Sequence, residues 1–193
     1  MTSETPLLSS AIDLVSREVR AAADDLASAG ADEWGERAAA ALGDAERVFV
    51  LGAGRSGIAL RMTAMRLMHL GLDVHVVGDA TTPAVARGDV LLVASGSGAT
   101  AGLVRSASTA KSSGATILAV SAVAESPLAK LADHLLVVSA ATKLDRSGTS
   151  SEQYAGSLFE QSVVIIGDAL FDLLRRRRDI SAERLWRRHA NLE

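Results

Sequence analysis

The chain contains no cysteine among its 193 residues, which excludes disulfide bonds and thiolate metal sites. Aromatic residues make up only 3% of it, so its core must consist mainly of Ala, Val, Leu and Ile. It also has no excess of positive charge: it contains 20 Lys and Arg residues and 23 Asp and Glu residues, which gives a formal net charge of −3. This balance argues against a general nucleic-acid-binding protein, which needs a basic face.

Long apolar runs are missing as well. No stretch approaches the roughly 18 residues of a membrane span, and the start of the chain, MTSETPLLSS, lacks the basic and apolar regions of a secretory signal. Hydrophobic residues nevertheless reach 48%, and 193 residues suffice for one domain with a sizeable core. We therefore expect a single domain over residues 1–193, in the cytoplasm, with neither a membrane nor a nucleic acid as partner.

Apolar periodicity predicts the secondary structure. Helical spacing predicts N-terminal helices over residues 7–44, interrupted at Gly30. From Arg47 onward, short apolar runs at 48–51, 74–77, 90–94, 116–120 and 135–138 alternate with helical segments at 57–70, 101–113, 126–132 and 152–178. Each run is apolar almost throughout, as strands buried on both faces are. The alternation indicates an α/β fold, a parallel sheet with right-handed crossovers.

Two connections and one terminal segment stand apart from this alternation. Residues 78–88, GDATTPAVARG, are too few and too polar for a long helix, and residues 139–151 are rich in Ser, Thr and charge. We interpret both as functional or mobile loops. The βα core is therefore predicted over residues 47–178, and the polar residues 179–193 are predicted to form an added terminal helix or arm.

Two Gly-rich loops each follow a predicted strand and precede a predicted helix. The first is GAGRSG, residues 52–57, where glycine lets the backbone approach a ligand and helix N-terminal amides can bind an anion. The second is SGSGAT, residues 95–100, where Ser95, Ser97 and Thr100 place hydroxyls among glycines. In open α/β sheets ligands gather at the carboxyl ends of the strands, where both loops lie. For either loop alone, a simple turn with a helix cap is the structural alternative.

The first loop also allows a dinucleotide-binding interpretation. GAGRSG fits the pattern G-x-G-x-x-G, and Asp79 lies near the position of a ribose-binding acid. That interpretation leaves the second loop unexplained and leaves no room for a separate substrate domain. We therefore favour a phosphorylated ligand, with phosphate bound by Ser56, Ser95, Ser97 and Thr100.

Several segments together resemble one family. GAGRSG, AMRLMHLGLDVHVVG, TTPAVARGD, SGSGAT, SPLAKLAD, GSLFEQ and the terminal HANLE are similar to the 6-phospho-3-hexuloisomerases of the sugar isomerase (SIS) domain family, over about residues 48–193. The resemblance implies a five-stranded parallel sheet flanked by helices in three Rossmann-like αβα layers. It also implies a homotetramer with active sites shared between subunits, and neither a metal nor an organic cofactor.

The activity that the resemblance implies is the conversion of D-arabino-hex-3-ulose 6-phosphate to D-fructose 6-phosphate, in the ribulose monophosphate pathway of formaldehyde assimilation. Two positions depart from the family pattern. Ala99 stands where relatives often carry an acidic residue, so no base can come from that position. Tyr154 and Ala155 stand before Gly156, where Pro and Met are common.

Such an isomerase needs a base, an acid that moves protons between oxygens, and donors for an enediolate. Glu160 in GSLFEQ is the candidate base; a helix-start carboxylate favoured by the helix dipole is the structural alternative. His69 in RLMHLG and His189 in HANLE are candidate catalytic residues, because histidine exchanges protons near neutral pH. By residue type alone His69 is a cap or packed side chain and His189 is solvent-exposed. The resemblance favours insertion of His189 into a neighbouring subunit's cleft.

The remaining assignments concern substrate binding, with Thr81 and Thr82 at the sugar end of the cleft, and the packing of one helix. Substrate binding is assigned to Gly54, Arg55, Thr81 and Thr82. Met62, Met65 and Met68 recur at every third position, which indicates packing in the core or at a subunit interface.

Two further functions stay open. A non-catalytic SIS module that binds a phosphosugar and signals would keep the serine loop and lack the catalytic Glu and His, so Glu160, His69 and His189 favour an enzyme. The other is an isomerase of a different phosphosugar, such as arabinose 5-phosphate. Only the resemblance carried by AMRLMHLG and HANLE argues against it.

Overall fold

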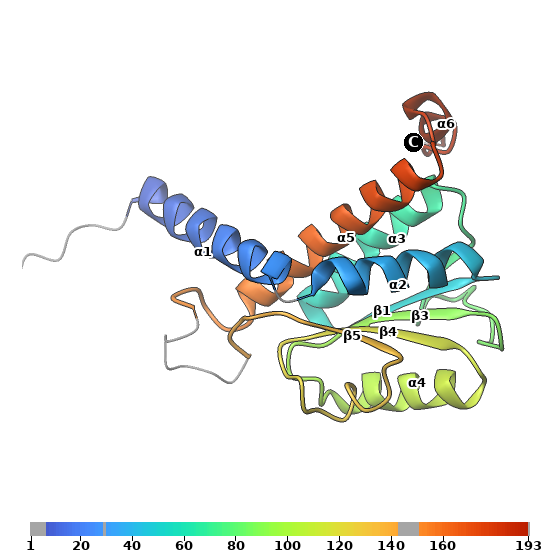
Figure 1. The fold of residues 1–193 in the computed structure, drawn as a ribbon, viewed down its shortest axis with the longest axis horizontal. Helices are drawn as coiled ribbons and strands as arrows, with labels where there is room; N and C mark the ends of the chain where they lie inside the picture. The colour runs from blue at the N-terminus through green and yellow to red at the C-terminus, as the bar shows by residue number, and fades with distance from the viewer. Residues whose placement is uncertain (1–6, 29, 143–150, 193) are drawn as a thin grey trace, which may run out of the picture.

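A five-stranded sheet forms the centre of the computed structural model (Figure 1). The described residues are 7–28, 30–142 and 151–192, so most of the loop predicted over 139–151 lies outside them. The strands are β1 (Val48–Gly52), β2 (Val74–Val76), β3 (Val90–Ala94), β4 (Thr116–Ser121) and β5 (His134–Val137). They pair in parallel in the order β2-β1-β3-β4-β5. The predicted fold class is confirmed, and each strand lies within one residue of its predicted bounds.

Helices cover both faces of the sheet. They are α1 (Leu8–Ser28), α2 (Ala31–Asp44), α3 (Gly54–His69), α4 (Ala101–Ser112), α5 (Ser157–Arg177) and the short α6 (Ala182–Trp186). Figure 1 shows α2, α3 and α5 over one face, α4 over the other, and α1 projecting from the body. Within the described residues, no helix combines the length and apolarity that crossing a membrane requires.

Side chains of successive strand residues point to opposite faces of the sheet, so the hydrophobic core is divided into two clusters, one on each face. Val50, Leu92 and Leu118 pack toward α2, α3 and α5, whereas Phe49 and Leu91 pack toward α4. All five of these side chains are buried. The strands are therefore apolar on both sides, which is why their sequence runs are nearly continuous in apolar residues.

Strand register and one small residue bring the two Gly-rich loops together. β1 and β3 are paired from Val48 opposite Val90 to Gly52 opposite Ala94, so both strands end at the same level and their loops begin side by side. On the covering layer, a Cβ added at Gly167 of α5 would overlap the hydroxyl of Thr63 in α3. This close contact holds α5 against α3, whose N-terminus lies within the first loop.

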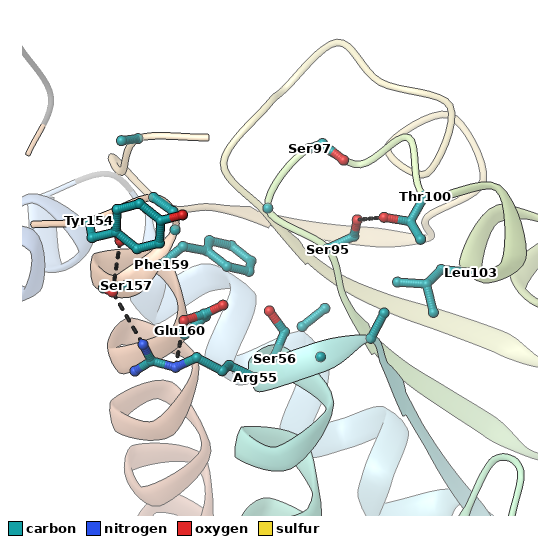
Figure 2. Close-up of a pocket in the computed structure, with 17 residues that line it drawn as sticks. Arg55, Ser56, Ser95, Ser97, Thr100, Leu103, Tyr154, Ser157, Phe159 and Glu160 are labelled. Atoms are coloured by element: carbon teal, nitrogen blue, oxygen red, sulfur yellow. Dashed lines mark hydrogen bonds and ion pairs between the residues drawn. The ribbon is translucent and has the colours of Figure 1, made fainter. Parts of the chain in front are cut away.

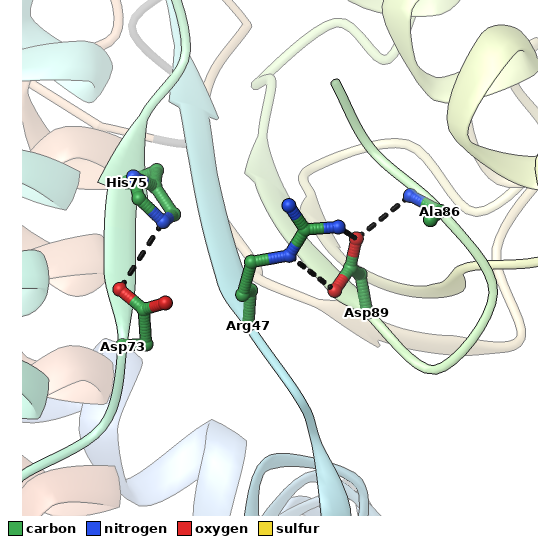
Figure 3. A network of polar contacts seen from close by, with 5 residues as sticks. All are labelled: Arg47, Asp73, His75, Ala86 and Asp89. Carbon is green, nitrogen blue, oxygen red and sulfur yellow. Dashed lines mark hydrogen bonds and ion pairs between the residues drawn. The ribbon is translucent and has the colours of Figure 1, made fainter. Parts of the chain in front are cut away.

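The β2–β3 connection, which has no helix, is anchored by an ion pair between a partly exposed Arg47 and a buried Asp89 (Figure 3). The Asp89 carboxylate, 0% exposed, accepts hydrogen bonds from Arg47 Nε at 3.0 Å and Nη2 at 2.8 Å, and from the Ala86 amide at 2.7 Å. Nearby, His75 Nε2 lies 3.2 Å from Asp73 Oδ1, a contact that is ionic only if the imidazole is protonated. The connection is non-helical as predicted, and Asp89 ties its end to β1.

Two predicted helical segments differ from the structure. Residues 127–131 form turns and no regular helix, although the Ser126 hydroxyl accepts from the Ala129 amide at 3.2 Å as a helix N-cap does; the helix predicted over residues 126–132 is wrong. The helix predicted from residue 152 begins at Ser157, because residues 151–153 bind α1 and Ala155 has φ of 53°. The predicted terminal helix is confirmed as α6.

Candidate active site

A cavity of about 460 Å³ opens at the carboxyl ends of β1 and β3 (Figure 2). Three loop–helix junctions supply nearly all of its lining: residues 53–56, residues 94–97 with Thr100 and Leu103, and residues 154–157 with Phe159 and Glu160. Ala141 completes it. The structure thus brings together the two loops singled out in the sequence and adds a third that the sequence analysis did not assign.

Three helix N-termini converge on this cavity. Helices α3, α4 and α5 begin at Gly54, Ala101 and Ser157, and their N-cap residues make no side-chain cap hydrogen bond. First-turn amides of a helix have no intrahelical acceptor, and the helix dipole makes this end positive. Both properties favour an anion at such a position. The combined field of three helices makes the cavity suited to a phosphate group.

Hydroxyl groups supplement the amides. Ser95 is buried, and its Oγ lies 3.3 Å from Thr100 Oγ1, a distance at which either can donate. Ser97 Oγ accepts from the Ala99 amide at 3.3 Å, and Ser56 is buried at the start of α3. Gly98, with φ of 60°, has no room for a Cβ, which would overlap the Ser126 side chain. The loop therefore requires glycine at this position to keep its hydroxyls at the cavity.

A carboxylate faces the cavity beside these donors. Glu160 Oε2 lies 2.9 Å from Arg55 Nε, and the Glu160 side chain is 21% exposed. Arg55 Nη1 also donates to Ser157 Oγ at 3.2 Å, and Ser157 Oγ donates to the Tyr154 carbonyl at 2.8 Å (Figure 2). A base and a cation thus lie next to the anion-binding amides. This arrangement can hold a phosphorylated molecule and remove a proton from it.

Comparison with known proteins assigns the family. The SIS domain pattern matches residues 41–165. The chain is 58% identical over 147 residues to the 3-hexulose-6-phosphate isomerase of Mycobacterium gastri, covering 76% of this chain and 74% of that relative. This chain belongs to the SIS domain family. The resemblance identified in the sequence is confirmed.

Two further matches agree with this assignment. The 3-hexulose-6-phosphate isomerase of Bacillus subtilis is 38% identical to this SIS domain over 148 residues, covering 76% of this chain and 80% of that one. A solved structure from Methanococcus jannaschii, described as inferring a molecular function of 3-hexulose-6-phosphate isomerase, has a TM-score of 0.77. It is 27% identical, and the match covers 95% of this chain and 99% of that one.

The third wall of the SIS-domain cavity was not predicted from the sequence. Tyr154, Ala155, Gly156 and Ser157 line it, whereas the apolar pattern predicted a helix across them. The available signal was the Gly156–Ser157 pair directly before the apolar stripe of α5, since both residue types favour a helix start. Ala99 is exposed and is not among the lining residues.

The two candidate histidines lie together, away from the cavity. Helix α3 runs from the cavity at Gly54 to His69, about 22 Å at 1.5 Å per residue. The His69 ring, 3% exposed, stacks on His189 with centroids 4.1 Å apart, and Trp186 lies 4.9 Å from His189. Burial lowers the pKa of His69, and electrostatic interaction with His189 and Arg66 lowers it further. Within one chain, the histidines contact each other and not Glu160.

Of the four residues assigned to substrate binding, Gly54 and Arg55 line the cavity, whereas Thr81 and Thr82 lie outside its lining. Thr81 is exposed, and Thr82 Oγ1 donates to the Val76 carbonyl at 2.6 Å. Thr82 lines a separate hollow of about 410 Å³ beside Phe49 and Leu91. Asp79, the acid of the dinucleotide interpretation, pairs with Arg61 at 2.8 Å. In the part of the chain that the structure describes, no three His, Asp or Glu side chains form a group that could hold a metal ion.

Proposed function

We propose that this SIS domain converts D-arabino-hex-3-ulose 6-phosphate to D-fructose 6-phosphate through an enediol. The observation that carries the proposal is the Glu160 carboxylate inside a cavity where three helix N-termini and a serine loop meet. The substrate follows from the relatives named 3-hexulose-6-phosphate isomerase, one of them 58% identical. The reaction belongs to formaldehyde assimilation by the ribulose monophosphate pathway, and we assign it to the cytoplasm because phosphorylated sugars are metabolised there.

The phosphate end of the substrate is assigned to the two Gly-rich loops. Ser56, Ser95, Ser97 and Thr100 offer hydroxyls, and the first-turn amides of α3 and α4 offer further donors. Gly54, with φ of 57°, leaves the backbone open to close approach. Arg55 is the only cationic side chain among the described lining residues. Phosphate binding at this site therefore depends mainly on helix dipoles and hydrogen bonds.

The carbon end of the substrate is assigned to Glu160. The carboxylate removes the proton from C2 while the C3 carbonyl oxygen gains one, which gives the enediol. A proton then returns at C3 while the C2 hydroxyl loses its own, which leaves a carbonyl at C2. Arg55, 2.9 Å from Glu160, supplies positive charge for the enediolate oxygens. The two steps balance without any added reactant.

We assign the proton transfer between the oxygens to His69 and His189 of a neighbouring subunit. Helix α3 carries an exposed apolar stripe of Ile58, Met62 and Met65, at i, i+4 and i+7. The stripe is centred on α3, because Ile58 lies four residues after Gly54 and Met65 lies four residues before His69. Antiparallel packing of two α3 helices across the stripe would place the histidines of each subunit beside the cavity of the other. The predicted shared site therefore has a matching surface.

A second apolar surface is compatible with the predicted homotetramer. The N-terminal half of α1, which projects from the body in Figure 1, exposes Leu8 and Ile12, and Leu7 directly before it is exposed as well. A closed tetramer built from twofold axes needs at least two different isologous interfaces, each pairing the same surface of two subunits. The α3 stripe and the projecting part of α1 are two separate candidates for these interfaces.

A coupled assay tests the proposal. Formaldehyde, ribulose 5-phosphate and a hexulose-phosphate synthase generate the 3-ulose, and formation of fructose 6-phosphate is followed with and without this protein. We expect fructose 6-phosphate only when the protein is present. No product above the synthase-only control, together with thermal stabilisation by a phosphosugar, would favour the non-catalytic module. Conversion of arabinose 5-phosphate instead would favour the other isomerase.

A further inference from the structure

The third wall of the cavity is fixed by a carboxylate from the distant helix α1. Glu18, half-buried, accepts through Oε2 from Ser151 Oγ at 2.6 Å and from Gln153 Nε2 at 3.0 Å. Its Oε1 accepts from the Glu152 amide at 2.7 Å. The Gln153 amide in turn donates to Ser151 Oγ at 3.0 Å. One side chain therefore holds three consecutive residues directly before the cavity-lining segment.

The charge of Glu18 is consistent with this role. Burial raises its pKa, but hydrogen bonds from Ser151, Glu152 and Gln153, together with the charge of Arg17, outweigh that effect, so the net pKa is lowered. The carboxylate is thus ionised at neutral pH, and ionised acceptors form the stronger hydrogen bonds.

Two routes lead from Glu18 to the proposed base. Gln153 Oε1 accepts from Gln161 Nε2 at 2.9 Å, and Gln161 is the residue after Glu160 on α5. Along the backbone, the segment continues through Ala155, whose φ of 53° is rare for a residue with a side chain. Such a conformation persists only where the surroundings constrain it. Glu18 constrains the segment on one side, and the bond from Ser157 Oγ to the Tyr154 carbonyl constrains it on the other.

We propose that Glu18 is a positioning residue that sets the start of α5 and thereby the location of Glu160 and its partner Arg55. The inference rests on the proposed function, in which Glu160 is the base. Glu18 itself lies outside the cavity lining and acts through residues 151–157.

The test removes the contact from each side. In Glu18→Ala and in Ser151→Ala, we expect hydrogen exchange of the Glu152 and Gln153 amides to rise about tenfold or more. Glu18→Ala removes the acceptor of the Glu152 amide and the partner of Ser151 Oγ. Ser151→Ala removes the acceptor of the Gln153 amide and one of the donors that hold Glu18 in place. We expect kcat to fall about tenfold through misplacement of the base, with KM changed less than about threefold because Ser95, Ser97 and Thr100 are untouched. Asp24→Asn, which removes an exposed ion pair with Arg20 on the same helix, serves as the control and keeps wild-type values.

Unchanged amide exchange, or wild-type kcat, in folded Glu18→Ala would overturn the inference, as would an equal loss in Asp24→Asn. If Glu18→Ala does not fold, Ser151→Ala decides by the same criteria. Amide exchange needs no substrate, so faster exchange in a protein with no isomerase activity would refute the proposed function while leaving the contact itself established.

Discussion

Individual side chains at the cavity show how phosphate can be bound with little formal charge. Ser97 contributes a hydroxyl at the turn of the second loop, among amides with no intrahelical acceptor. We predict that Ser97→Ala raises KM about tenfold, the effect of losing roughly 1.4 kcal/mol of binding free energy. Steady-state kinetics measure this, with Ser108→Ala on the exposed surface of α4 as the control. An unchanged KM would remove Ser97 from the phosphate site.

The sequence predicted residues of this cavity where the signal was local. Ser95, Ser97 and Thr100 follow a buried strand directly, so parallel pairing was enough to place them. Thr82 also follows a strand, but its hydroxyl is used by the Val76 carbonyl, and nothing in the local sequence reveals that bond. The contacts of Glu18 were equally hidden, because its partners lie more than a hundred residues away in the sequence.

At the scale of elements, the contact between α3 and α5 controls the cavity. Their crossing depends on Gly167, where a Cβ would overlap the Thr63 hydroxyl. We predict that Gly167→Ala destabilises the protein by about 2 kcal/mol through overpacking and lowers kcat, since both helix N-termini line the site. Urea unfolding and kinetics measure the two effects. Adding Thr63→Ala should restore part of the stability, and a fully stable Gly167→Ala protein would contradict this account of the packing.

Docking of the C-terminal segment onto α3 should depend on pH. The pKa of His69 is lowered below its ordinary value of 6.5, mainly by burial and further by electrostatic interaction with His189 and Arg66. The folded protein therefore binds fewer protons than the unfolded chain between the two pKa values. The stabilisation from this contact is complete above pH 6.5 and decreases as the pH falls toward the lowered value.

We predict that Trp186 fluorescence and amide exchange in residues 182–189 report undocking as the pH falls from 7.5 to 5. Trp186 is a suitable probe because it lies 4.9 Å from the His189 ring. In His69→Gln the pH dependence should disappear. A wild-type signal that stays constant over this range, or an equal response in His69→Gln, would show that His69 does not control docking.

Apolar periodicity predicted most elements but not all of their ends. The strands were predicted within one residue because each forms a nearly continuous apolar run, although only β1, β3 and β4 are buried on both faces and β2 and β5 are partly exposed. The start of α5 was wrong because its position is set by the contact of residues 151–153 with α1 and by the φ of Ala155. Tertiary contacts of this kind have no local sequence pattern.

At the scale of the whole molecule, the distance between Glu160 and the histidines requires a partner subunit for the proposed site. We predict that Met62→Glu, at the centre of the exposed α3 stripe, reduces the molar mass measured by light scattering and abolishes activity. Arg105→Glu on α4, over the opposite face of the sheet, is the control and leaves both unchanged. A dissociated Met62→Glu protein with full activity would contradict the shared site.

The central claim is that Glu160 transfers the proton that moves the carbonyl between C2 and C3. With fructose 6-phosphate labelled with ¹³C at C2, NMR distinguishes C2 of this sugar, which is chiefly a hemiketal carbon in water, from the hydroxyl-bearing C2 of the 3-ulose. We predict that the wild-type protein interconverts the two signals, and that Glu160→Gln does so at least roughly 100-fold more slowly while remaining folded and able to bind phosphosugar. Interconversion by Glu160→Gln at the wild-type rate would contradict the account.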